Sequence, residues 1–95
     1  GLAWKNSDSE HASKHLKHVY EMLQVYTGPF VSDDVKECLW PYAEEMGKGD
    51  VLWPLRYALS GREKSPDPFM LLSLFGKDES LARIAHAIML LENKS

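Results

Sequence analysis

The sequence has little of what disulfide-linked, secreted and membrane proteins require. It has 95 residues and one cysteine, Cys38, so no internal disulfide can form, and the reducing cytoplasm is the expected location. No apolar run approaches the roughly 20 residues that a membrane-spanning helix needs. The N-terminus also lacks a basic region followed by an apolar stretch, which would mark a signal peptide. We therefore expect one small domain over residues 1–95, with no membrane partner.

Excess positive charge and catalytic motifs are missing as well. The formal net charge is −3, which argues against a nucleic-acid binder that uses a broad basic face. Any contact with nucleic acid must therefore be local, or must be helped by another part of a longer chain. The sequence contains neither a Gly-x-Ser-x-Gly elbow nor a Gly-x-x-x-x-Gly-Lys-Ser/Thr phosphate loop. We expect these residues alone to be non-catalytic.

Helix signals are what the sequence does contain, and no segment is convincing as a strand. Start signals indicate five helices, which open at the capping box of residues 7–10, at Ser32, at Asp50, at Ser65 and at Asp78. Glycines at Gly61 and Gly76 are predicted to end the third and fourth. Pro41 falls inside the second helix, so a kink or a break is expected there. The predicted fold is all-α, a compact bundle of about five helices.

Three histidines share one predicted helical face. His11, His15 and His18 stand at i, i+4 and i+7, and a His pair at i, i+4 can bind Zn²⁺, with Cys38 as a further ligand. No second motif at ligand spacing accompanies them. A half-exposed polar face beside the apolar stripe explains the same pattern, so we expect no metal site and expect the histidines to be dispensable.

Residues 49–69 hold the most informative pattern, because two predicted helices must meet there at a tight corner. Arg56 stands between inward-facing leucines on the first of these helices. Its stem could cover apolar surface while its head pairs with an acid such as Asp50. Alternatively, its guanidinium could point at a base edge or a phosphate.

Further polar groups follow Gly61 in the segment that connects the two predicted helices. Arg62 and Lys64 add positive charge, and a helix start at Ser65-Pro66 would present free N–H groups beside them. Chemistry alone leaves two readings of this corner open, a structural one and a ligand-contacting one.

The segment GDVLWPLRYALSG, with the Ser-Pro and LLSLFGKDESLARI that follow it, resembles the C-terminal anticodon-binding domain of bacterial glutamyl-tRNA synthetase. The matching positions are Pro54, Leu55, Arg56, Ala58, Leu59, Ser60, Gly61, Ser65, Pro66, Phe69, Gly76, Lys77 and Arg83. The strong part covers residues 47–91, whereas residues 9–46 fit only the looser helical pattern. The resemblance implies the anticodon-binding α-helix cage of a class I aminoacyl-tRNA synthetase. The HIGH and KMSKS signatures of the catalytic domain do not occur, so that domain is expected to be absent from this fragment.

The resemblance also implies a set of anticodon contacts. It places them at Arg56, at the Ser65-Pro66 loop and at Pro68, and the charge pattern adds Arg62 and Lys64. Asp67 stands where the family usually has Gly, and Pro68 stands where Leu is commoner. A carboxylate beside RNA is unfavourable, so we expect Asp67 to cap the helix rather than touch phosphate.

The implied partners are glutamate tRNA and the rest of the synthetase chain, in a monomeric enzyme; whether glutamine tRNA is also a substrate is left open. The fragment itself needs no cofactor, whereas the parent enzyme would use ATP and Mg²⁺ to join glutamate to its tRNA. A non-catalytic helical protein-interaction module is the alternative, which the acidic residues 33–45 would suit. A helix-turn-helix DNA binder is disfavoured, because the second helix is expected to be a core helix on account of Phe69, Leu71, Leu72 and Leu74.

Overall fold

A computed structural model of the protein describes residues 6–61 and 67–93. These residues form four α-helices and no strand: α1 (Asn6–Val25), α2 (Ser32–Met46), α3 (Lys48–Ser60) and α4 (Pro68–Glu92). The predicted all-α class is therefore confirmed. None of the described helices combines the length and the apolar character that crossing a membrane would require.

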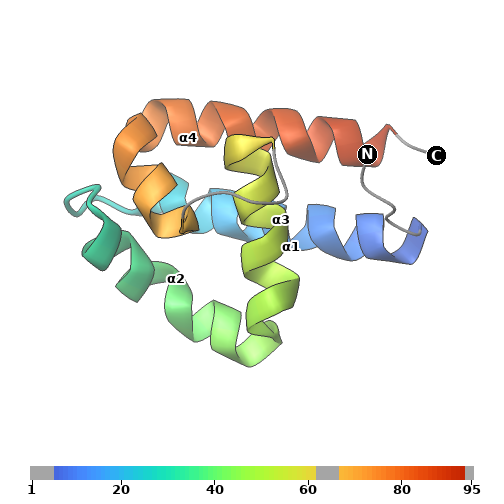
Figure 1. The fold of residues 1–95 in the computed structure, drawn as a ribbon, viewed down its shortest axis with the longest axis horizontal. Coiled ribbons are helices and arrows are strands. Elements are labelled where there is room, and N and C mark those ends of the chain that lie inside the picture. The colour runs from blue at the N-terminus through green and yellow to red at the C-terminus, as the bar shows by residue number, and fades with distance from the viewer. Residues whose placement is uncertain (1–5, 62–66, 94–95) are drawn as a thin grey trace.

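The number of helices differs from the predicted five, because α4 replaces the last two. Gly76 has a non-helical conformation, with φ 80° and ψ 172°, yet the chain is helical directly on both sides of it. Figure 1 shows the result as a short first part of α4 set at an angle to a long second part. The buried Ser80 hydroxyl donates to the carbonyl of Leu72 at 3.3 Å and so joins the two parts. Gly76 was correctly identified as an interruption, and Asp78 stands two residues after it, near the beginning of the second part of α4.

Three helices begin at other residues than predicted. Helix α1 starts at Asn6, so Ser7 of the predicted capping box lies inside it. Helix α3 starts at Lys48, so Asp50 lies in its first turn and is not its N-cap. Helix α4 starts at Pro68, and the carboxylate of Asp67 accepts a hydrogen bond from the backbone N–H of Phe69 at 2.7 Å. The capping role expected of Asp67 is thus confirmed, and the N-cap predicted at Ser65 is wrong.

Helix α2 begins at Ser32 as predicted and carries Asp33 and Asp34 in its first turn, where acidic side chains complement the helix dipole. It runs through Pro41 to Met46, so the break considered at Pro41 does not occur. Pro41 and Glu37, whose carbonyl loses its helical donor, are both exposed. Water can therefore take the place of the missing hydrogen bond.

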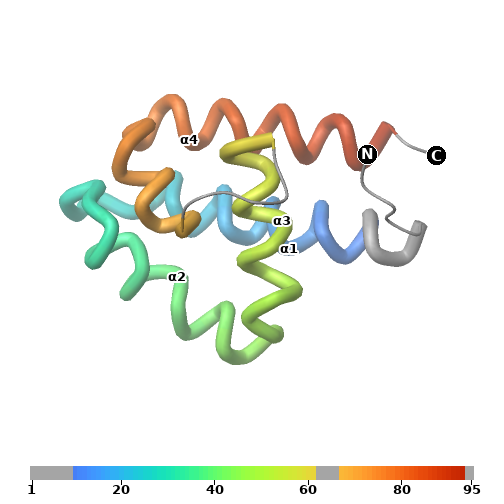
Figure 2. Tube along the Cα trace, viewed as in Figure 1, coloured from blue at the N-terminus to red at the C-terminus, as the bar shows by residue number. Residues whose placement is uncertain are grey.

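The apolar stripes of all four helices meet in one core. Its fully buried side chains include Leu16, Leu23, Leu39, Leu55, Leu59, Leu72 and Ile84. Figures 1 and 2 show α1 and the long part of α4 side by side and running in opposite directions, with α3 crossing them. This packing fixes the direction of α3, and therefore the position of Arg56 on it.

Candidate nucleic-acid interface

The end of α3 is held by backbone geometry and by one arginine. Gly61 has φ 73°, and its N–H donates to the carbonyl of Tyr57 at 2.7 Å, which confirms the predicted glycine stop. Nη1 of Arg83 on α4 donates to the carbonyl of Leu59 at 2.9 Å. Because the last carbonyls of a helix have no partner within it, this bond ties α3 to α4 at the corner.

Arg83 makes two further contacts within α4. Its Nε donates to Glu79 at 2.8 Å, and its guanidinium carbon lies 4.0 Å from the centroid of the Phe75 ring. The arginine that the family resemblance places in the last helix therefore braces the corner.

Arg56 is bonded differently. It is half-buried on α3, and its Nε atom is buried with no hydrogen-bond partner among the residues that the structure describes. The ion pairs within residues 10–61 and 67–93 do not include one between Arg56 and Asp50. A buried polar nitrogen without a partner destabilises a fold.

The remaining predicted contacts lie near the start of α4. Pro68 is its first residue and is fully buried, so in this state it supports the helix start. Arg62, Lys64, Ser65 and Pro66 lie outside the described residues. Their roles, and a nucleobase contact by Pro68, stay predictions.

A cluster of cations on an aromatic ring was not predicted. The Nζ atoms of Lys36 and Lys48 each lie 5.0 Å from the centroid of the Trp40 ring, which is half-buried. The Trp40 ring also meets Phe69 edge-on, with centroids 6.2 Å apart and planes at 60°. The i, i+4 spacing of Lys36 and Trp40 could have indicated the contact between these two residues. The contact of Lys48 with Trp40 depends on how α3 packs against α2, which no local pattern predicts.

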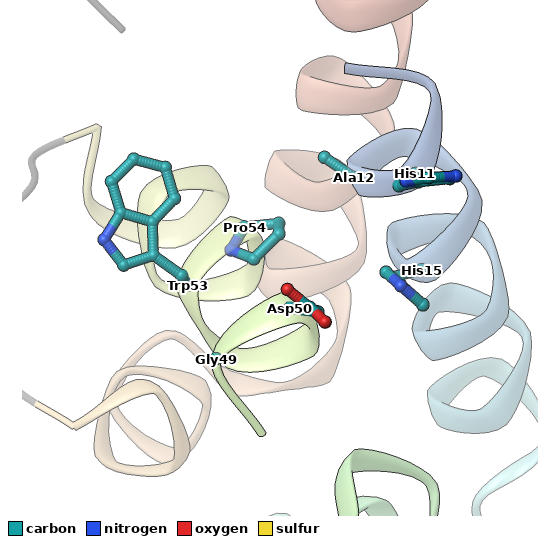
Figure 3. Close-up of a pocket in the computed structure, with 7 residues that line it drawn as sticks. All are labelled: His11, Ala12, His15, Gly49, Asp50, Trp53 and Pro54. Atoms are coloured by element: carbon teal, nitrogen blue, oxygen red, sulfur yellow. The ribbon is translucent and has the colours of Figure 1, made fainter. Parts of the chain in front are cut away.

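The histidines pack around Tyr42 of α2. Nδ1 of His15 shares a hydrogen bond with the Tyr42 hydroxyl at 2.8 Å, and the His18 ring stacks on Tyr42 with centroids 4.0 Å apart. The pKa of His15 is lowered from its usual 6.5, mainly because burial disfavours the charged imidazole. The nearby carboxylate of Asp50 acts in the opposite direction and raises this pKa. Figure 3 shows Asp50 on α3 facing His15 on α1 across a cavity of about 370 Å³.

No group of three potential metal ligands occurs in the described part of the chain. His15 and His18 both contact Tyr42; His15 is buried, unlike the half-exposed face expected, whereas His18 is exposed.

A family model described as the anticodon binding domain matches residues 2–88. The chain belongs to this family. In this domain, contacts around Trp40 join three elements: Lys36 and Trp40 of α2, Lys48 of α3 and Phe69 of α4.

Curated relatives agree with this assignment. The chain is 38% identical over 79 residues to glutamate–tRNA ligase 1 of Mesorhizobium japonicum. This alignment covers 81% of the chain and 17% of the relative. It is 38% identical over 85 residues to the glutamate–tRNA ligase of Lachnoclostridium phytofermentans, covering 86% of the chain and 17% of the relative. The enzyme of that name from Flavobacterium johnsoniae is 34% identical over 85 residues, with 90% and 16% covered.

The anticodon-binding domain therefore spans about a sixth of the length of the curated relatives it matches. No solved structure matches it.

Proposed function

We propose that this domain binds the anticodon loop of glutamate tRNA as the C-terminal part of a glutamate–tRNA ligase. The family match over residues 2–88 carries the proposal, and the names of the relatives supply the tRNA. The complete protein would join glutamate to its tRNA with ATP and Mg²⁺ in a catalytic part outside these residues. It would act in the cytoplasm as a monomer.

Arg56 is the residue of the described surface best suited to read the anticodon. Anticodon bases are unstacked, so their edges are open to side chains and backbone groups. Helix α3 holds Arg56 next to the buried Leu55, and the Arg56 residue itself is half-buried, so part of it stays accessible to a ligand. An arginine fork can hold a base through two parallel hydrogen bonds, which a lysine cannot reproduce.

Binding of an anticodon stem-loop tests the proposal. The 95-residue chain should bind the labelled stem-loop of glutamate tRNA more tightly than the same stem with the anticodon replaced. Arg56→Ala should weaken binding about tenfold to a hundredfold, because a bidentate arginine is worth about 1–3 kcal/mol of base discrimination. Arg56→Lys should not restore it.

Lys14→Ala, at an exposed position of α1, is the matched control for loss of a cation, and thermal unfolding checks that each variant folds. Equal affinity for both loops would refute anticodon recognition and favour the helical protein-interaction module. Discrimination that survives Arg56→Ala would make Arg56 a structural residue of the corner.

A further inference from the structure

The cluster of Lys36, Trp40 and Lys48 brings two cations together without an acid between them. Each Nζ atom lies 5.0 Å from the centroid of the same indole ring, so the two nitrogens are within twice that distance of each other. Both lysines are exposed, and neither forms an ion pair with any residue that the structure describes. The ring attracts both ammonium groups through its negative face, which offsets their mutual repulsion.

The cluster lies beside the corner that carries the proposed anticodon contacts. Trp40 meets the ring of Phe69, the second residue of α4, so the cluster flanks the start of that helix. Lys48, Leu52 and Arg56 follow one another at four-residue spacing and therefore lie along one side of α3. Lys36 and Lys48, both in contact with Trp40, thus lie at the N-terminal end of α3, on the side of this helix that also carries Arg56.

Two neighbouring ammonium groups without a carboxylate partner suit an anionic polymer whose charges repeat at short intervals. A nucleic-acid strand is such a polymer, and phosphate contacts set its position while base contacts supply specificity. We infer that Lys36 and Lys48, held over Trp40, bind phosphates of the tRNA strand next to the anticodon and so place the loop against Arg56. This inference rests on the proposed function and adds a phosphate-binding site on α2 and α3 to it.

Glu44 offers an opposite test of the same site. It follows Trp40 by four residues, which puts it on the same side of α2, and it is exposed. It has no ion-pair partner within residues 10–61 and 67–93. A carboxylate there repels phosphate, so Glu44→Gln should strengthen RNA binding. Lost folding stability cannot produce such a gain.

The main experiment is the salt dependence of binding to the glutamate tRNA anticodon stem-loop. For a single strand, the logarithm of the binding constant falls with the logarithm of salt concentration by about 0.7 for each phosphate neutralised. The double variant Lys36→Gln/Lys48→Gln should therefore have a slope about 1.4 smaller in magnitude than the unmodified chain. Its ability to distinguish the correct anticodon from a replaced one should remain.

A matched control removes the same charge elsewhere. Lys14→Gln/Lys17→Gln changes two exposed lysines of α1, of which Lys17 forms an ion pair with Glu92 of α4. Neither lysine contacts the Trp40 ring, and thermal unfolding checks that losing the ion pair leaves the fold intact. The slope of this control should stay at the unmodified value. If the slope changed equally in the two double variants, the change would come from net charge alone, and the inference would be overturned.

An unchanged slope in Lys36→Gln/Lys48→Gln, with anticodon discrimination intact in the unmodified chain, would overturn the phosphate site alone. Failure of the unmodified chain to distinguish the two anticodons would instead remove the proposed function, and the inference with it.

Discussion

At the residue scale, Arg56 and Arg83 show how two arginines near one corner take different roles. Arg83 has a backbone carbonyl, a carboxylate and an aromatic ring as partners. Arg56 keeps a buried Nε with no partner in the described part of the chain. The sequence singled out Arg56 because it is a cation between buried leucines. Which arginine is occupied depends on contacts across helices, so no local pattern could predict it.

His15 gives the pH-dependent prediction at this scale. Burial lowers its pKa below 6.5, so between 6.5 and the lowered value the unfolded chain binds a proton more readily than the folded one. The free energy of unfolding therefore falls as pH drops through that window and recovers as pH rises above 6.5. The midpoint of thermal unfolding should drop by more degrees between pH 7.5 and 5.5 in the unmodified chain than in His15→Gln.

His86→Gln, at an exposed position of α4, is the control and should behave like the unmodified chain, because His86 is not among the groups that shift the pKa of His15. Carboxylates contribute to acid destabilisation in all three proteins, so the comparison isolates His15. Parallel pH profiles for His15→Gln and the unmodified chain would contradict the prediction.

At the scale of the element, the sequence located the helix ends better than the helix starts. Gly61 and Gly76 were identified because only glycine readily adopts positive φ, and both do so here. The start of α4 was placed two residues early, because Ser65-Pro66 and Asp67-Pro68 are both a capping residue followed by proline. Burial of Pro68 and Phe69 against the core selects the second pair. Tertiary packing decides between two equal local signals.

The bend at Gly76 gives the prediction for an element. At φ 80° and ψ 172° an alanine is strained, although no atom lies within 4 Å of the position its Cβ would take. Gly76→Ala should therefore lower the free energy of unfolding by about 1–3 kcal/mol through backbone strain alone. Chemical denaturation of the purified variant measures this.

Gly49→Ala is the matched control, since Gly49 lies in α3 without positive φ and also has open space around a Cβ. That change should leave stability unchanged or raise it by up to about 1 kcal/mol. If Gly76→Ala were as stable as Gly49→Ala, the bend would not depend on glycine.

At the scale of the whole molecule, composition argued against a broad basic face and the structure offers a local one. The net charge is −3, yet Lys36 of α2 and Lys48 of α3 meet on the ring of Trp40. A sequence of linked motifs over residues 47–91 was enough to indicate the family, which the match over residues 2–88 confirms. The meeting of Lys36 and Lys48 on Trp40 was not foreseen, because residues 9–46 carry only a general helical pattern.

Absence of catalysis is the prediction that belongs to the whole chain. Neither HIGH nor KMSKS occurs in its 95 residues, so nothing in the sequence would hold ATP and glutamate for adenylate formation. The purified chain should give no glutamate-dependent exchange between ATP and pyrophosphate, with or without tRNA, while still binding the anticodon stem-loop.

The control is a mock purification from the same expression host without the chain. It separates any activity of the chain from that of the host synthetase. Exchange that follows the chain through successive columns and is absent from the mock sample would mean that these residues contain an active site. The division proposed here, between an anticodon-binding part and a separate catalytic part, would then be wrong.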